Sequence, residues 1–300
     1  MKKKYWFLIL AVLVASVAWN VYWNSTITVH TYTHVNEDIP EVYDGLRIVQ
    51  LTDLHSVRNE AQGQLVYETI LEQKPDIICM TGDLVDSRYY ASNGVEGESL
   101  TLGLMKKLVK LAPVYYVYGN HEMILLDDPQ KNAFKVALEK IGVQIINNEK
   151  LCYTKEEGGD AIFIGGIQDP STLYKDYRYA FLSNNGERME AMLDAVTVGV
   201  RNEDFFLLLS HRPEYLEMYD QYPVDLCLTG HAHGGQFRLP IVGGLYAPGQ
   251  GFLPKYTAGL YATDDLEMYV GTGVGNSVIP FRIFNPPEIL TIILKTTSNQ

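Results

Sequence analysis

Five short apolar runs along the chain each end in polar side chains of the kind that bind metal ions. The runs occupy residues 47–55, 76–83, 114–122, 205–211 and 224–233. An apolar run of about four to eight residues between turn residues is typical of a buried strand. Because ligands in open α/β sheets collect at the carboxyl ends of the strands, we expect these polar ends to lie together.

Helical patterns separate these strands. In residues 98–111 apolar side chains recur on one face, at Leu100, Leu104, Leu108 and Leu111, and lysines lie on the other. Further helices are predicted at 60–73, 132–141 and 187–198, and further strands at 143–146, 161–167, 266–270 and 289–294. Alternating strands and helices followed by late strands predict an α/β fold, a layered sandwich of mixed sheets.

Residues 234–262 differ from the rest because they are rich in Gly, Pro and Tyr. A structureless loop of this length is uncommon in a compact domain unless it has a function. The part at 243–261 suits contact with lipid, and a packed surface loop is the alternative interpretation.

The N-terminus carries the clearest membrane signal. Residues 5–23 hold no charge and follow Lys2, Lys3 and Lys4. A helix of this length rises about 28 Å, close to the hydrocarbon thickness of a bilayer. All three tryptophans flank the segment, as expected at membrane interfaces, and the lysines predict a cytoplasmic N-terminus. We therefore expect a single-pass anchor in the cell membrane, with the remaining chain on the extracytoplasmic side.

A cleaved signal peptide is the alternative for this segment, because residues 16–18 (Ser-Val-Ala) form a plausible cleavage site. The apolar run continues past that site, which favours an uncleaved anchor. We predict three parts: an anchor at 1–24, a linker that becomes an edge strand at 25–45, and one globular domain at 46–297.

Composition narrows the function classes. The formal net charge is −12, and lysines and arginines form no cluster beyond the first four residues. Nucleic-acid binding is therefore not expected, since it depends on basic side chains that neutralise phosphates. The three cysteines form no CxxC pair, so we expect the core rather than a disulfide framework to hold the fold. Nothing in the sequence predicts a protein partner.

The polar ends of the strands share a chemistry. They carry Asp53, His55, Asp83, Asn120, His121, His211, His231 and His233. Five of the seven histidines of the chain lie in these motifs. Each motif alone is a weak signal, but five in succession after predicted strands indicate a metal-dependent enzyme. Oxygen and nitrogen ligands without thiolates suit divalent ions such as Mn, Fe, Zn or Co.

The motif order D-x-H, G-D, G-N-H-E, H, G-H-x-H resembles that of the calcineurin-like metallophosphoesterases. The resemblance covers residues 46–295 and implies a four-layer α/β/β/α sandwich with two metal ions at the sheet edge. It implies that Asp53, His55 and His233 hold one ion, that Asn120, His211 and His231 hold the second, and that Asp83 bridges them.

The resemblance also implies a mechanism. A hydroxide bridging the metals would attack phosphorus, and His121 would face the substrate and protonate the leaving oxygen. Asp86, three residues after Asp83, would orient His121.

The N-terminal segment and the stretches 230–251 and 271–289 resemble a membrane-anchored bacterial subgroup. Some of its members hydrolyse UDP-2,3-diacylglucosamine, a lipid A precursor made on the cytoplasmic side, whereas the predicted topology places this domain outside. We expect a phosphodiesterase or a pyrophosphatase. Lipid-linked phosphoesters are among its candidate substrates. The alternatives are a phosphomonoesterase or protein phosphatase, and a non-catalytic binding module on the same scaffold.

Overall fold

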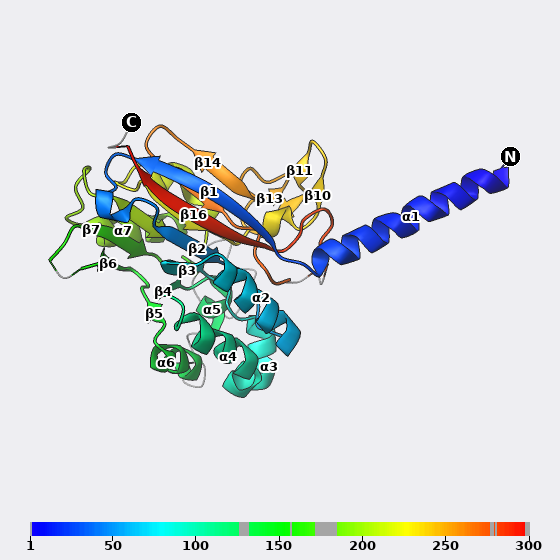
Figure 1. Ribbon diagram of the computed structural model, residues 1–300, viewed down its shortest axis with the longest axis horizontal. Coiled ribbons are helices and arrows are strands. Elements are labelled where there is room, and N and C mark those ends of the chain that lie inside the picture. Colours follow the sequence, from blue (N-terminus) through cyan, green and yellow to red (C-terminus); the bar gives the residue numbers. More distant parts are fainter. Residues whose placement is uncertain are drawn as a thin grey trace.

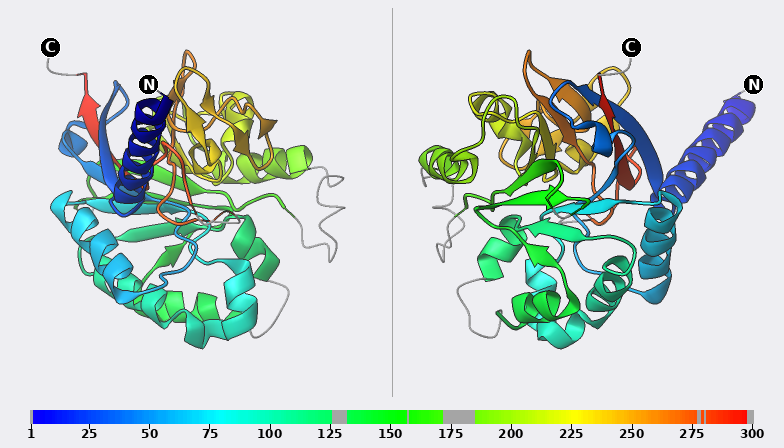
Figure 2. Two further views of the ribbon diagram at one scale, coloured as in Figure 1. Left: turned by 90° about the vertical axis from the view of Figure 1, so that its right-hand side faces the viewer. Right: turned by 60° about the vertical axis from the view of Figure 1, so that its left-hand side comes forward.

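Two six-stranded sheets form the centre of the molecule (Figures 1 and 2). The computed structural model describes residues 2–125, 132–156, 158–171, 185–276, 279 and 281–297. Helices cover the outer face of each sheet, so the layers run α/β/β/α. The expected α/β sandwich of mixed sheets is confirmed.

The first sheet has the strand order β1-β16-β2-β3-β4-β5. Its strands are β1 (Thr28–Asn36), β16 (Glu288–Thr296), β2 (Arg47–Leu51), β3 (Ile77–Thr81), β4 (Val114–Val117) and β5 (Gln144–Ile145). Strands β2 to β5 are parallel to one another, and β16 runs antiparallel to β2. The parallel strands therefore end at the same edge of the sheet.

The second sheet has the order β14-β15-β9-β8-β7-β6. Its strands are β14 (Gly259–Ala262), β15 (Glu267–Val270), β9 (Leu226–Thr229), β8 (Phe206–Leu209), β7 (Ala161–Gly166) and β6 (Glu149–Thr154). The four inner strands are parallel, and the two outer strands are antiparallel to their neighbours.

Alternation along the strands sorts side chains between two faces. Leu207 and Leu209 of β8 pack between the sheets, whereas Phe206 and Leu208 face the helices. The core between the sheets also holds Ile48, Ile77, Val117, Leu228 and Ile292, all buried. This shared apolar layer keeps the edges of the two sheets in register.

Helices α2 (Glu60–Glu72), α3 (Ser87–Gly97), α4 (Ser99–Leu108) and α6 (Asn132–Ile141) pack on the first sheet. Helices α7 (Asn185–Thr197) and α8 (Leu216–Tyr219) pack on the second. Short α5 (Asn120–Leu125) follows β4, and 3-10 turns η1 (Glu41–Tyr43), η3 (Pro213–Tyr215) and η4 (His233–Gly235) join other elements. The helices predicted within the domain are confirmed, and α3, α5 and α8 were not predicted.

The predicted loop at 234–262 is not structureless. It forms two small antiparallel hairpins and β14. The hairpins pair β10 (Arg238–Leu239) with β11 (Gly243–Gly244), and β12 (Tyr246–Ala247) with β13 (Gly251–Phe252). Strands of two residues leave no periodic pattern, which is why the sequence did not indicate them.

Helix α1 (Lys2–Asn24) projects from the domain (Figure 1). Its segment Tyr5–Asn24 has a mean hydropathy of 1.8 and no buried share, so by length and composition it could cross a membrane. The stretch after it forms edge strand β1, which pairs with β16. The division into anchor, linker and domain stays a prediction.

Shortening Leu228 to alanine should lower the free energy of unfolding by about 2 to 5 kcal/mol, because the side chain lies fully buried between the sheets. Urea unfolding of the full chain in detergent, stripped of metal, measures the change. Leu71→Ala on α2 is the matched control, since Leu71 is 45% exposed, and its expected effect is within about 0.5 kcal/mol. Equal losses in both variants would contradict the location of the core.

Candidate metal centre

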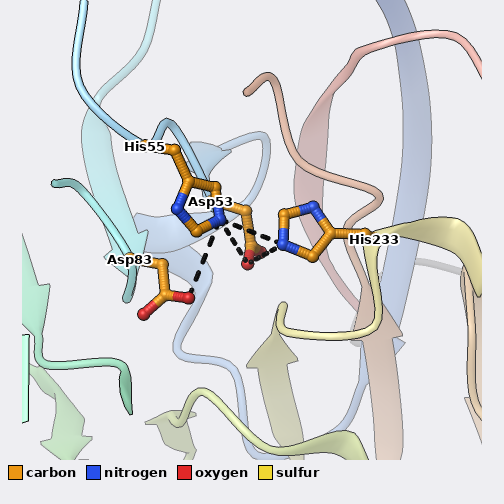
Figure 3. A group of neighbouring side chains, drawn as sticks. All are labelled: Asp53, His55, Asp83 and His233. Atoms are coloured by element: carbon orange, nitrogen blue, oxygen red, sulfur yellow. Dashed lines mark hydrogen bonds and ion pairs between the residues drawn. The ribbon is translucent and has the colours of Figure 1, made fainter. Parts of the chain in front are cut away.

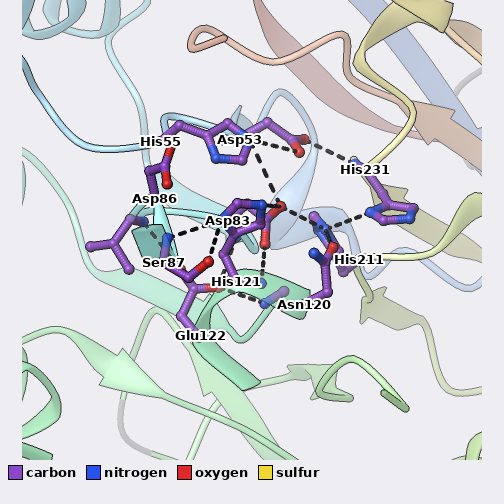
Figure 4. Close-up of polar contacts among 12 residues, drawn as sticks. Asp53, His55, Asp83, Asp86, Ser87, Asn120, His121, Glu122, His211 and His231 are labelled. Atoms are coloured by element: carbon purple, nitrogen blue, oxygen red, sulfur yellow. Dashed lines mark hydrogen bonds and ion pairs between the residues drawn. The ribbon is translucent and has the colours of Figure 1, made fainter. Parts of the chain in front are cut away.

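The parallel strands deliver eight polar side chains to one edge of the two sheets (Figures 3 and 4). Strands β2, β3 and β4 lead to Asp53, His55, Asp83, Asn120 and His121, and strands β8 and β9 lead to His211, His231 and His233. All eight are the residues that the sequence predicts for the site. Each sheet thus contributes part of one polar cluster.

Five of these residues have left-handed backbone conformations. They are Asp53 (φ 49°), His55 (φ 50°), Asp83 (φ 52°), His231 (φ 66°) and His233 (φ 47°). This conformation costs about 1 to 2 kcal/mol per residue for side chains other than glycine. Such strain persists where the surrounding fold imposes it, and it is concentrated at functional sites. The sharp turns aim the side chains back over the strand ends.

The first cluster comprises Asp53, His55, Asp83 and His233 (Figure 3). Nε2 of His233 lies 3.3 Å from Asp53 Oδ1, and Nε2 of His55 lies 3.8 Å from Asp83 Oδ2. The two Nε2 atoms are 3.0 Å apart, with their rings nearly parallel at 22°. Four donor atoms thus converge on one point.

This convergence fits a metal ion. Asp53 Oδ1 is buried and has no hydrogen-bond partner among the residues that the structure describes. The 3.0 Å separation of the His55 and His233 Nε2 atoms also matches the spacing of about 3 Å expected for two ligands that each lie about 2 Å from one metal ion. The residues present therefore suit a divalent cation.

The second cluster comprises Asp83, His211 and His231, with Asn120 beside them. Nε2 of His211 lies 3.1 Å from His231 Nδ1, 3.2 Å from Asn120 Oδ1 and 3.4 Å from Asp83 Oδ2. His211 Nδ1 donates a hydrogen bond to the carbonyl of Thr81 at 2.7 Å. That bond leaves the lone pair of Nε2 facing the cluster, as a metal ligand requires.

Asp83 belongs to both clusters. Its Oδ2 atom lies between His55 Nε2 and His211 Nε2, at 3.8 Å and 3.4 Å. Its Oδ1 atom accepts a hydrogen bond from the backbone N–H of His121 at 2.9 Å. One oxygen therefore faces both ion positions while the other is held by the backbone. Two clusters that share a carboxylate are consistent with a dinuclear metal site.

Protonation states support the same conclusion for three histidines, two in the first cluster and one in the second. Burial lowers the pKa of His233 to about 4 and holds the pKa of His55 well below 6.5. Burial likewise holds the pKa of His231 well below 6.5. These imidazoles are neutral at neutral pH, and a metal ligand must be neutral imidazole.

His211 is the exception. Burial opposes its protonation, but the Asp83 carboxylate outweighs burial and raises the pKa of His211 to about 10. Burial would also raise the pKa of Asp83, yet His211 and His121 hold it well below 3.8. A positive charge is thus favoured beside Asp83, and a divalent ion supplies it when bound.

Glu122 has a supporting role that the sequence analysis missed. Its Oε2 atom accepts hydrogen bonds from the backbone of Asp83 and of Gly119, both at 2.9 Å, and Oε1 accepts from Val85 at 3.1 Å. Burial raises the pKa of Glu122 to about 7. The glutamate in the motif G-N-H-E was a signal for this role. Glu122 fixes the turn that carries Asp83.

Ser87 is the second residue that the sequence analysis missed. Its backbone N–H donates to His121 Nδ1 at 3.0 Å, and its hydroxyl lies 3.2 Å from the same atom. Asp86, predicted to orient His121, instead accepts hydrogen bonds from the backbone of Arg88 and Tyr89 and caps α3. Asp86 therefore fixes the start of the helix whose first residue, Ser87, contacts His121.

A sequence profile of the calcineurin-like phosphoesterases matches residues 46–235. The chain belongs to this family. This calcineurin-like phosphoesterase is 30% identical over 262 residues to the uncharacterized metallophosphoesterase YkuE of Bacillus subtilis, covering 87% of this chain and 82% of that protein. It is 27% identical over 251 residues to phosphodiesterase YaeI of Escherichia coli, covering 83% and 82%.

A third relative is the transmembrane protein with metallophosphoesterase domain of Danio rerio. It is 30% identical over 266 residues, which cover 86% of this chain and 55% of that protein. Family membership and the buried His/Asp clusters make this calcineurin-like phosphoesterase a hydrolase with a dinuclear metal site.

Replacing the shared carboxylate should remove both metals. We expect about two equivalents of metal per chain in the native protein and a loss of both in Asp83→Ala, because its Oδ2 atom faces both clusters. Elemental analysis after gel filtration measures the content. His34→Ala is the matched control, since His34 is equally buried but its Nδ1 contacts Glu267. Full metal content in Asp83→Ala would refute a bridging carboxylate.

Proposed function

We propose that this protein hydrolyses phosphodiester or pyrophosphate bonds, with Asp83 holding two metal ions side by side. The observation that carries the proposal is the single buried Asp83 oxygen facing both clusters. In each cluster the ligand atoms point to a common centre, as expected if each cluster binds one ion.

We assign Asp53, His55 and His233 to one ion. Asn120, His211 and His231 take the second, and Asp83 takes both. Two bound ions from the series Mn, Fe, Zn and Co would polarise the phosphoryl oxygens and make a water molecule more acidic. The protein's own residues then have to supply a proton to the leaving oxygen and select the class of phosphoester that binds.

His121 is placed to supply the proton. The Ser87 N–H at Nδ1 makes Nε2 the protonated nitrogen of the neutral ring. Nε2 lies 4.0 Å from Asp83 Oδ2, so its N–H points into the site. When the P–O bond breaks, this proton passes to the leaving oxygen. Asp86 positions His121 indirectly by capping the helix that begins at Ser87.

The arginines around the site favour a diester over a monoester. Arg212 is bound to Asp169, Glu214 and Ser171. Arg238 donates to Gly234 and Thr257, whereas Arg58 lies on the Tyr89 ring and pairs with Asp86. All three guanidinium groups make contacts within the protein, which supports a diester substrate over a terminal phosphate dianion. Similarity to phosphodiesterase YaeI supports the same substrate class.

The apolar helix α1 supports membrane attachment, as does similarity to a transmembrane relative. We propose that α1 is an uncleaved anchor and that Lys2, Lys3 and Lys4 keep its start in the cytoplasm. The domain then acts outside, on a phosphoester substrate that includes lipid-linked diesters among its candidates. UDP-2,3-diacylglucosamine is one substrate to test. A binding module without catalysis would not need the intact ligand set and His121.

The substrate proposal predicts metal-dependent cleavage of bis(p-nitrophenyl) phosphate in preference to p-nitrophenyl phosphate. Metal-stripped full chain, reloaded with Mn²⁺, should hydrolyse the diester, and His121→Ala should reduce kcat by about 10²- to 10⁴-fold. UDP-2,3-diacylglucosamine is assayed in parallel. His30→Ala is the control, because His30 is half exposed on β1. Faster cleavage of the monoester would favour the phosphomonoesterase alternative.

A proline at position 87 tests how His121 is held. Ser87 is the first residue of α3, where proline is tolerated, and Asp86 before it has an extended backbone (φ −86°, ψ 115°). Ser87→Pro removes the N–H that His121 accepts and should lower kcat by about 10- to 100-fold with full metal content. Ser87→Ala keeps that N–H and should retain most activity. If the two variants lost equal activity, the hydroxyl rather than the backbone would orient His121.

A further inference from the structure

Exposed apolar side chains gather on the hairpins after the site. The side chains of Ile241 (fully exposed), Val242, Phe252 and Leu253 face solvent in β10 to β13 and the turns that follow them. Phe281 and Phe284 are also half exposed. Among the described residues after α1, the exposed large aromatic side chains are Tyr246, Phe252, Phe281 and Phe284. We call this set, with Ile241, Val242 and Leu253, the apolar rim.

Charge is absent from the same segments. Residues 239–254 contain no charged side chain, and in 271–287 the one charged residue is Arg282, which is fully buried. The chain as a whole carries a net charge of −12. A surface without charge on such an acidic protein is unusual for a face that contacts water alone.

The tips of the apolar rim are also strained. Ile241 has φ 72°, Leu253 has φ 54° and Phe284 has φ 49°. A positive φ is a true outlier for a β-branched residue such as Ile241. Glycine would relieve the strain at each position, and neither packing nor solubility explains an apolar side chain there. Strained residues of this kind point to a function of the side chain.

The apolar rim lies where α1 leaves the domain. Figure 1 shows β10, β11 and β13 on the side of the domain from which α1 projects. Hydrogen bonds join the two parts: Asn20 and Asn24 donate to the carbonyl of Arg282 at 2.8 and 2.9 Å. The N–H of Arg282 donates to Asn24 at 3.1 Å. The end of α1 is thereby held beside Phe281 and Phe284.

We propose that the apolar rim rests in the surface of the lipid bilayer that α1 crosses. The inference relies on the proposed membrane anchoring and goes beyond it by naming a second contact. If α1 spans the bilayer, its end near Asn24 lies at the interface. Side chains held at that level enter the headgroup region, where aromatic residues are favoured and charges are not.

This contact would place the metal centre close to the membrane. The turn η4, which contains His233, leads directly into β10. Asn285 donates to the carbonyl of His233 at 2.7 Å, and Phe284 precedes Asn285. Arg282 also lies 3.5 Å from His233 Nδ1 through its guanidinium. Arg282 and Asn285, which neighbour the rim residues Phe281 and Phe284, thus also contact His233, a proposed ligand of the first ion.

Lipid quenching tests the contact in the full chain. Single cysteines replace Ile241 or Phe252 in a Cys152→Ser background, because Cys79 and Cys227 are buried. Each is labelled with a nitrobenzoxadiazole dye and reconstituted in phosphatidylglycerol–phosphatidylethanolamine vesicles containing phosphatidylcholine spin-labelled near the headgroup. We expect at least twofold stronger quenching at both sites than at a matched Val198→Cys control. Val198 is 72% exposed and follows α7, on the side of the domain away from α1 (Figure 1).

The native tryptophans separate the two possible failures. All three lie in α1, so their quenching reports on the anchor alone. Quenched tryptophans with dyes at 241 and 252 quenched no more than at 198 would overturn the rim contact and leave the anchoring in place. Unquenched tryptophans would overturn both. Dye emission shifted to the blue without lipid quenching would show that a second copy of the chain covers the rim, and would also overturn the proposal.

Discussion

The buried carboxylate of Asp83 is the constraint on which the site depends. One of its oxygens faces both clusters, so a small displacement would disturb both ion positions at once. Three features hold it: Glu122 accepts from its backbone N–H, His121 donates to its second oxygen, and Gly119 lies against it. A Cβ atom at Gly119 would collide with the Asp83 carboxylate, which explains the glycine. The close approach of these two turns is therefore built into the backbone.

The packed core between the two sheets holds the turns of the metal site in their strained backbone conformations. Such strain persists only where the surrounding structure is rigid. Asp53, His55 and Asp83 follow strands of one sheet, and His231 and His233 follow a strand of the other. Gln50 joins the sheets just behind them, donating to Thr81 Oγ1 at 2.7 Å and to the carbonyl of Thr229 at 2.8 Å. This buried amide sets the spacing between the strand ends from which the clusters grow.

Much of the fold and site could be predicted because the relevant signals are local. Apolar runs marked β2, β3, β4, β8 and β9, and the polar residues after them marked all eight site residues. Elements without a repeating apolar pattern were not predicted. Helix α3 is polar and is interrupted at Gly94, which has a non-helical backbone, and β10 to β13 have two residues each. The contacts of Ser87 and Glu122 escaped for another reason. They join turns that are distant in sequence, and the amino-acid sequence alone does not show which backbone N–H lies against which side chain.

The pairing of β1 with β16 ties the beginning of the domain to its end. Thr28 pairs with Glu288 and Asn36 with Thr296, and β16 lies between β1 and β2 in the sheet. During synthesis, the segment that follows α1 would leave the ribosome about 260 residues before its strand partner. Parallel pairing across such a separation is slow, since a long loop has to close first. If α1 is the membrane anchor proposed above, the nascent chain would wait beside the membrane with an open sheet edge until residues 288–296 arrive.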